Sequence, residues 1–93
     1  MIKSFANKRT EAIWNREFAK GIDPAISKTA YRKLFQLHTV TRLADLKIPP
    51  ANHLEALRGY RKGQWSIRVN DQFRLCFSWR DGDVLDVEFV DYH

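Results

Sequence analysis

Alternating apolar and polar residues fill the C-terminal third of the chain and limit most strongly how it can fold. The runs QWSIRV (64–69), FRLCFSW (73–79) and VLDVEFV (84–90) each place a large apolar side chain at every second position. A period of two that is rich in aromatic and β-branched residues is typical of antiparallel strands with one buried face. The sequence therefore predicts a sheet built around these three strands.

Two loops set the register of this sheet, because each pairing must keep the apolar side chains on one face. A two-residue loop at 70–71 would put apolar and polar side chains together on the same face of the sheet. A three-residue loop at 70–72 keeps them apart and places an Asn or Asp in the left-handed region. The same reasoning predicts a three-residue loop at 81–83. The resulting apolar pairs are Val69 with Phe73, Ile67 with Leu75, Trp65 with Phe77, Trp79 with Leu85 and Phe77 with Val87.

The polar face of the sheet then carries two arginines directly opposite each other. Arg68 faces Arg74, and Tyr92 lies one diagonal step from Arg74. Two facing guanidinium groups repel each other, so the pair becomes favourable when an anion lies between them. The alternative is that one of the two arginines pairs with Glu88 across the sheet. The polar face is therefore a candidate phosphate site.

The N-terminal half predicts two antiparallel helices. Residues 7–20 form the first, with an Asn cap at its start, Trp14 and Phe18 stacked at i,i+4, and a glycine after its end. An Asp-Pro pair begins the second, whose apolar stripe runs from residue 26 to 41. Residues 2–5 are a candidate edge strand, and residues 52–57 fit either a helical turn or a short strand. Helices covering one face of a mainly antiparallel sheet make an α+β fold.

Length and composition predict one small domain spanning residues 1–93. We expect no membrane association and no export, since the chain shows no apolar run of about 20 residues and no hydrophobic signal region. A single cysteine and the absence of a metal-ligand cluster favour a reducing cytoplasm and a site without metal or cofactor.

The positive charge is concentrated in the helical part of the chain. Residues 1–62 hold thirteen Lys or Arg and five Asp or Glu, a net +8, whereas residues 63–93 hold three and six, a net −3. Basic surfaces of this kind suit a polyanionic partner, above all nucleic acid. A solvated basic surface that keeps the protein soluble is the alternative.

The run LRGYRKGQWSIRVNDQFRLCFSW, followed by VEFVDYH, closely resembles the HigB toxins of the RelE/ParE superfamily. The MIKSF opening and the two-helix layout match as well, so the likeness covers essentially the whole chain. The resemblance implies a bacterial type II toxin that cuts mRNA in the ribosomal A site, on the 30S subunit, and so halts translation. It also implies a HigA-like antitoxin with a helix-turn-helix domain, through which alone the complex would bind operator DNA.

By motif, the active-site positions of this family fall on residues near the end of the chain and on the polar face. These positions are Arg74, Asp91, Tyr92 and His93, with Arg68 beside them. The family often has a histidine at the position of Glu55, whereas this chain has its histidine two residues earlier, at His53. Both residues therefore stay candidates.

Each candidate residue suits one part of a metal-free RNA cleavage, in which the 2′-OH attacks the adjacent phosphate. The arginines can bind the phosphate with two parallel hydrogen bonds. His93, with an ordinary pKa of roughly 6.5, can act as general acid or base. Asp91 can orient that imidazole or act as base, and Tyr92 can stack on an unpaired RNA base.

A glycine-bounded basic loop precedes the first strand and offers three more cations for RNA phosphates: Arg58, Arg61 and Lys62. Two other functions stay open. One is a ParE-like gyrase poison, which needs no acid or base. The other is a non-catalytic RNA-binding module on the same sheet.

Overall fold

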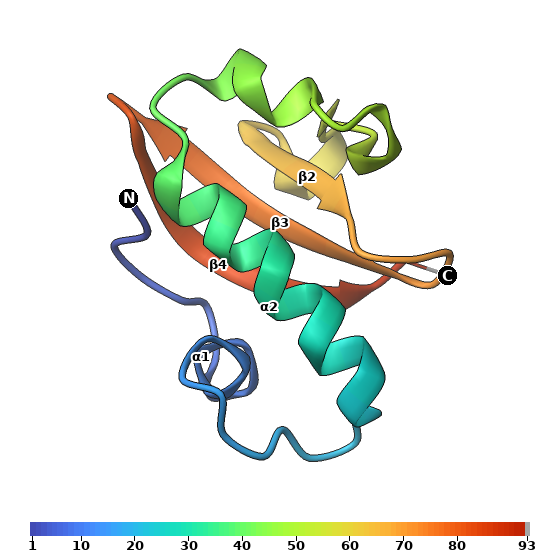
Figure 1. Cartoon of the computed structure of the whole chain (residues 1–93). Coiled ribbons are helices and arrows are strands. Elements are labelled where there is room, and N and C mark those ends of the chain that lie inside the picture. Colours follow the sequence, from blue (N-terminus) through green and yellow to red (C-terminus); the bar gives the residue numbers. More distant parts are fainter. Residues whose placement is uncertain (93) are drawn as a thin grey trace.

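The computed structural model describes residues 1–92, whose two helices cover one face of a twisted four-stranded sheet (Figure 1). The helices and strands are α1 (Lys8–Trp14), α2 (Pro24–Thr39), β1 (Glu55–Ala56), β2 (Gln64–Arg68), β3 (Phe73–Arg80) and β4 (Asp83–Asp91). Three short 3-10 turns lie between them: η1 (Leu43–Lys47), η2 (Pro50–Asn52) and η3 (Gly59–Arg61). The strands follow the order β1-β2-β3-β4, and all neighbours are antiparallel. The predicted α+β class is confirmed.

The hairpin of β2 and β3 has the predicted three-residue loop, but none of residues 70–72 adopts the left-handed conformation expected there of an Asn or Asp. The Val69 amide donates to the Phe73 carbonyl at 2.9 Å, which closes the loop. Inside it, the Asn70 side-chain oxygen accepts hydrogen bonds from the Gln72 and Phe73 amides at 2.9 and 2.8 Å. The predicted register follows, with the pairs Trp65–Phe77, Ile67–Leu75 and Arg68–Arg74.

The hairpin of β3 and β4 differs from the prediction. Its loop has two residues, 81 and 82, with φ angles of 50° and 85°. Both residues are left-handed, as a type I′ turn requires, and this turn matches the twist of the strands. Trp79 therefore faces Val84 instead of Leu85. A bulge at Asp86 (φ 53°) absorbs the extra residue, and beyond it the strands pair in the predicted register.

The N-terminal residues add a short parallel edge to β4. Ile2 bridges to Val84 and Phe5 to Val87. The Lys3 amide donates to the Val84 carbonyl at 2.8 Å. Residues 2–5 thus join the sheet as predicted, through two isolated bridges.

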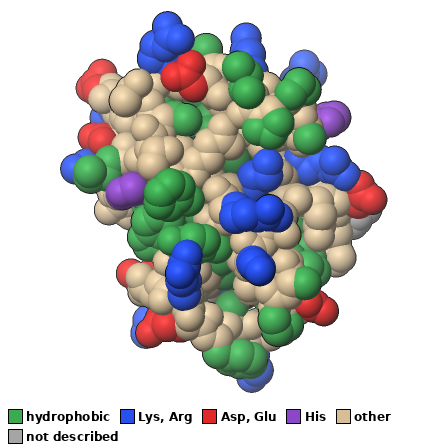
Figure 2. Space-filling model, in the orientation of Figure 1, with side chains coloured by type: hydrophobic (Ala, Val, Ile, Leu, Met, Phe, Trp, Pro, Cys, Tyr) green, Lys and Arg blue, Asp and Glu red, His purple; other side chains and the backbone are tan. Residues whose placement is uncertain are grey.

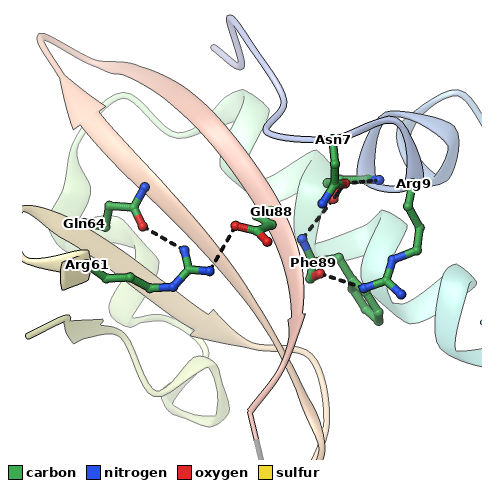
Figure 3. Close-up of polar contacts among 7 residues, drawn as sticks. Asn7, Arg9, Arg61, Gln64, Glu88 and Phe89 are labelled. Atoms are coloured by element: carbon green, nitrogen blue, oxygen red, sulfur yellow. Dashed lines mark hydrogen bonds and ion pairs between the residues drawn. The ribbon is translucent and has the colours of Figure 1, made fainter. Parts of the chain in front are cut away.

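Helix α1 begins at the predicted cap and is tied there to the sheet. The Asn7 side-chain oxygen accepts from the amide and the hydroxyl of Thr10 at 2.9 and 2.7 Å. The same hydroxyl accepts from the Phe89 amide of β4 at 2.9 Å (Figure 3). One buried threonine therefore links the start of α1 to the middle of β4.

Helix α1 ends earlier than predicted, at Trp14 instead of near residue 20. Arg16 adopts a φ of 58°, and the Glu17 amide donates back to the Ala12 carbonyl at 2.9 Å. This is the Schellman arrangement that more often uses glycine at the left-handed position. The predicted stop after residue 20 is wrong because the chain has already left the helix.

The predicted stacking of Trp14 on Phe18 is also wrong. Trp14 instead stacks on Tyr31 of α2, with ring centroids 5.6 Å apart, and Phe18 is 84% exposed. Figure 1 shows α1 nearly end-on where α2 runs across the view, so the two helices cross instead of lying side by side. The contact between α1 and α2 includes the Trp14 ring against both Tyr31 and His38 of α2.

Helix α2 starts as predicted and supplies the helical side of the core. The Asp23 carboxylate accepts from the Ala25 amide at 2.8 Å, and Pro24 occupies the first turn. Burying each large apolar side chain contributes roughly 1.5–3 kcal/mol. The fully buried members of the core are Ala30, Leu34, Leu37, Leu46, Ile67, Leu75, Phe77, Val84, Val87 and Phe89.

Basic side chains are spread across the face that carries the helices, and acidic ones lie nearer its margins (Figure 2). This distribution agrees with the net +8 of residues 1–62. Within residues 1–92, no helix combines the length and the apolar character needed to cross a membrane.

The segment between α2 and β2 is fixed by one buried side chain, Asn52. Its amide nitrogen donates to the Gln36 side chain at 2.9 Å and to the Leu46 carbonyl at 3.1 Å, and its oxygen accepts from the Lys33 ammonium at 2.6 Å. These bonds bring the following residues alongside β2. Within residues 52–57, Asn52 ends the 3-10 turn η2 and residues 55 and 56 form the short strand β1, so the strand alternative is the one observed.

We predict that Asn52→Ala destabilises the fold by about 1–3 kcal/mol, because it leaves buried carbonyl and amide groups without partners. Urea unfolding measures the change. Lys28→Ala, on the exposed side of α2, is the control and should stay within about 0.5 kcal/mol of the parent. An Asn52→Ala variant as stable as that control would contradict this role.

Candidate active site

A cleft of about 700 Å³ opens on the polar face of the sheet. It is lined by residues 55–58, 60 and 61 from β1 and its connection to β2, by Cys76 of β3, and by residues 90–92 at the end of β4. Segments far apart in the sequence therefore meet there. The cleft brings together five predicted site residues: Glu55, Arg58, Arg61, Asp91 and Tyr92.

Arg74 lies beside this cleft with only 6% of its surface exposed. Its Nε donates to the Ser66 hydroxyl at 2.8 Å, and its Nη2 donates to the His53 carbonyl. Its Nη1 is 3.8 Å from the Glu55 carboxylate, and its guanidinium carbon is 5.2 Å from the centre of the Tyr92 ring. The guanidinium is thus held in one orientation and contacts two residues that line the cleft.

Arg68 pairs with Arg74 in the strand register, but its guanidinium binds the adjacent loop. Its Nη2 donates to the Asp71 carboxylate, and its Nε donates to the Asn70 carbonyl at 3.2 Å. Asp71 is 95% exposed in its side chain. An ion pair this exposed contributes at most about 1 kcal/mol, so Arg68 can exchange it for another anion.

Glu88, a possible partner of Arg68 or Arg74 from the sequence, instead forms its ion pair with Arg61. Figure 3 shows its guanidinium between Glu88, at 3.0 Å, and the side-chain oxygen of Gln64, at 3.1 Å. The hydrogen bond to Glu88 raises the pKa of Arg61 further above its ordinary value. Arg61 therefore anchors its loop to the polar face.

Arg58 and Lys62, the other two cations of the basic loop, are exposed. Neither forms an ion pair with another of the residues 1–92. The structure thus divides the three predicted RNA-binding cations into one anchored residue and two that face solvent.

The end of β4 is fastened to the loop between β2 and β3. The Tyr92 amide donates to the Gln72 carbonyl at 2.8 Å, and the Gln72 side chain donates to the Asp91 carboxylate at 3.0 Å. The Tyr92 ring is half exposed at the cleft. His93, the remaining predicted residue of this group, lies outside the described residues.

His53 and Glu55, the two alternatives from the sequence, occupy different places. His53 is left-handed (φ 45°) and contributes its carbonyl to Arg74, while its residue as a whole is exposed. Only Glu55 of the two lines the cleft. Glu55 thus places its carboxylate 3.8 Å from the Arg74 guanidinium, whereas His53 contributes a backbone carbonyl.

A family model described as a RelE-like toxin of the type II toxin-antitoxin system HigB matches residues 3–93. The chain belongs to this family of HigB-like toxins. It is 38% identical to Toxin HigB-1 of Vibrio cholerae serotype O1 over 94 residues, covering 100% of this chain and 98% of that protein. It is 29% identical to Endoribonuclease HigB of Proteus vulgaris, and the match covers 100% of both chains.

A solved complex supports the fold of this HigB-like toxin. The YoeB-YefM complex from Staphylococcus aureus contains a chain that superposes with a TM-score of 0.54 at 19% identity. The match covers 100% of this chain and 95% of that one. At this identity the likeness concerns the fold alone.

Sequence reasoning missed two residues that support the site of this HigB-like toxin. Ser66 is fully buried and accepts the Nε–H of Arg74, and Gln72 holds the end of β4. Ser66 lies on the polar face of a strand, one diagonal step from Arg74, which is a signal that could have identified it. Gln72 carries no such signal, since it lies inside a loop.

A second hollow, of about 530 Å³, lies on the helical side, where the end of α1 meets the start of α2. Its lining is largely apolar and includes the exposed Phe18.

In the described part of the chain, no group of three or more His, Cys, Asp or Glu side chains is arranged to hold a metal ion.

Cys76 lies at the cleft but its thiol is inert by position. It is fully buried, and this burial raises its pKa, so little thiolate forms at neutral pH.

We predict that an aromatic disulfide reagent labels Cys76 at least about 100-fold more slowly in the native protein than in denaturant. Absorbance of the released thiolate measures both rates. Comparable rates in the two states would contradict the buried position.

Proposed function

We propose that this HigB-like toxin is an endoribonuclease that cuts mRNA on the ribosome. One observation carries the proposal: a buried arginine, Arg74, is held in a fixed orientation beside an open cleft that a carboxylate and a half-exposed aromatic ring also border. A preoriented cation next to groups for proton transfer and base stacking suits phosphoryl transfer on RNA. The relative named Endoribonuclease HigB supports the same activity.

The proposed reaction uses the RNA itself as nucleophile. The 2′-oxygen forms a bond to the adjacent phosphorus, and the bond from phosphorus to the 5′-oxygen of the next nucleotide breaks. A base takes the proton of the 2′-OH, and an acid gives a proton to the departing 5′-oxygen. The products are a 2′,3′-cyclic phosphate and a 5′-hydroxyl, so atoms and charge balance without a cofactor.

Arg74 stabilises the negative charge that develops on the phosphorane in this scheme. Glu55 lies 3.8 Å from Arg74 and accepts the proton of the 2′-OH. Protonation of Glu55 removes the charge that partly neutralises Arg74, just as the phosphorane becomes more negative. Asp91 is the second candidate base, and His93 supplies the proton to the leaving oxygen.

The remaining residues bind the substrate. Tyr92 stacks on an unpaired base with one face of its ring, while the Arg74 guanidinium lies over a face of the same ring at 5.2 Å. Arg68 exchanges its exposed partner Asp71 for a phosphate. Arg58 and Lys62 contact backbone phosphates without regard to sequence.

Membership of a toxin-antitoxin family supports an antitoxin as the partner in this proposal. A HigA-like antitoxin with a helix-turn-helix domain neutralises the toxin in the cytoplasm, and operator DNA is bound only through it. The ribosomal A site, on the 30S subunit, supplies the mRNA. A ParE-like gyrase poison or a passive RNA-binding module needs no carboxylate beside Arg74, so the geometry favours the nuclease.

The deciding experiment compares one mRNA with and without translating ribosomes. Primer extension should show cuts only on the ribosome, and the upstream products should end in a 2′,3′-cyclic phosphate. A 2′-deoxy nucleotide at the cut position should abolish that cut, since the nucleophile is missing. Efficient cutting of free mRNA would contradict the ribosome requirement, and cutting of the deoxy substrate would contradict the 2′-OH mechanism.

We predict that Arg74→Lys lowers the single-turnover cleavage rate by about 10²-fold or more, because lysine cannot form the same planar set of hydrogen bonds. Programmed ribosomes and rapid quench provide the measurement. Arg80→Lys, an exposed arginine at the other end of β3, is the matched control and should cleave at the parental rate. Equal rates for Arg74→Lys and Arg80→Lys would remove Arg74 from the mechanism.

A further inference from the structure

Tyr60 is the most exposed aromatic residue in the described chain, at 98%. The other two tyrosines pack on neighbours: Tyr31 stacks on Trp14, and Tyr92 lies 5.2 Å from the guanidinium of Arg74. A single exposed apolar side chain is common and needs no explanation by itself. The surroundings of Tyr60 are what distinguish it.

Tyr60 is displayed on a turn that is fastened on both sides. The turn η3 is closed by the Lys62 amide, which donates to the Gly59 carbonyl at 3.0 Å. The base of the loop is closed by the Leu57 amide, which donates to the Gln64 carbonyl at 2.9 Å. The next residue, Arg61, is tied to Glu88 and Gln64 (Figure 3). An exposed ring on an anchored turn loses little conformational entropy when it binds.

The neighbours of Tyr60 have the chemistry of a single-stranded nucleic acid site. Exposed Arg58 and Lys62 lie two residues away on either side, and Tyr60 lines the same cleft as Tyr92. Aromatic rings alternating with cations are how proteins bind unpaired strands, since bases stack on the rings while phosphates meet the cations.

We propose that Tyr60 is a second base-stacking platform, which holds an unpaired RNA base at the outer rim of the cleft while Tyr92 holds another at the reaction centre. The inference rests on the proposed nuclease function and adds a binding subsite to it. Tyr60 touches no reacting group, so it acts on substrate binding and leaves the chemical step unchanged.

The test is steady-state cleavage on mRNA-programmed ribosomes by Tyr60→Ala, Tyr60→Phe and Tyr60→Trp. Loss of one stacking platform should raise KM about 5- to 100-fold in Tyr60→Ala, with kcat within about twofold of the parent. Phe and Trp keep an aromatic face, so KM should stay within about threefold. Phe18→Ala removes another largely exposed ring, 84% exposed, on the helical side and should change neither constant. Thermal melts confirm folding of each variant.

An mRNA with one abasic nucleotide beside the cut site identifies the source of the base. If Tyr60 holds an mRNA base, Tyr60→Ala adds no further loss on the abasic substrate at that position. If it holds a ribosomal RNA base, the loss persists there in full. Both results support a stacking platform.

A parental KM for Tyr60→Ala, or an equal loss in Tyr60→Phe, would overturn the inference while leaving the nuclease intact. A parent protein that cuts no RNA on the ribosome would overturn the proposed function and this subsite together.

Discussion

The contacts of the Arg74 guanidinium hold the cleft together. They join β2, through the Ser66 hydroxyl, to the chain just before β1, through the His53 carbonyl. β1 itself pairs with β2 at only two positions, so the ladder alone would hold this wall of the cleft weakly. Glu55 then partly neutralises the buried charge that makes these bonds. The interactions that place the wall therefore also orient the cation, and neither function can be separated from the other.

The parts of the fold that follow from side-chain alternation could be predicted from the sequence. The alternation of apolar and polar residues fixes which side chains lie on the same face of the sheet, and the loop at Asn70 fixes the register of β2 and β3. Once that register is set, Arg68 must face Arg74. The position of Tyr92 depends on the β3–β4 register, which agrees with the prediction near Arg74 because the bulge at Asp86 offsets the shorter loop, and the Tyr92 ring lies 5.2 Å from the Arg74 guanidinium. The position of the C-terminal residues on the polar face of the sheet can therefore be predicted without knowing where the helices lie.

The parts that depend on competition between distant partners could not be predicted. Residues 81 and 82 fit a two-residue or a three-residue loop, and the bulge at Asp86 decides between them. Trp14 would continue a helical stripe, but Tyr31 offers a better stacking partner and the helix stops. Arg61 pairs with Glu88, which is 27 residues away in the sequence, because its long side chain can reach several different acceptors. In each case tertiary contact overrides a local pattern.

The size of the domain bears on why the proposed nuclease would depend on the ribosome. The cleft is open, its outer rim is formed by a fully exposed Tyr60, and two of the three cations near it reach into solvent. Such a surface offers few fixed contacts with which to align a flexible strand for in-line attack. Alignment of reacting groups contributes up to about 7–11 kcal/mol to a rate enhancement. Under the proposed function, a codon held in the A site would bring that alignment with it, and the toxin would add only the fixed cation, the proton transfers and the stacking rings.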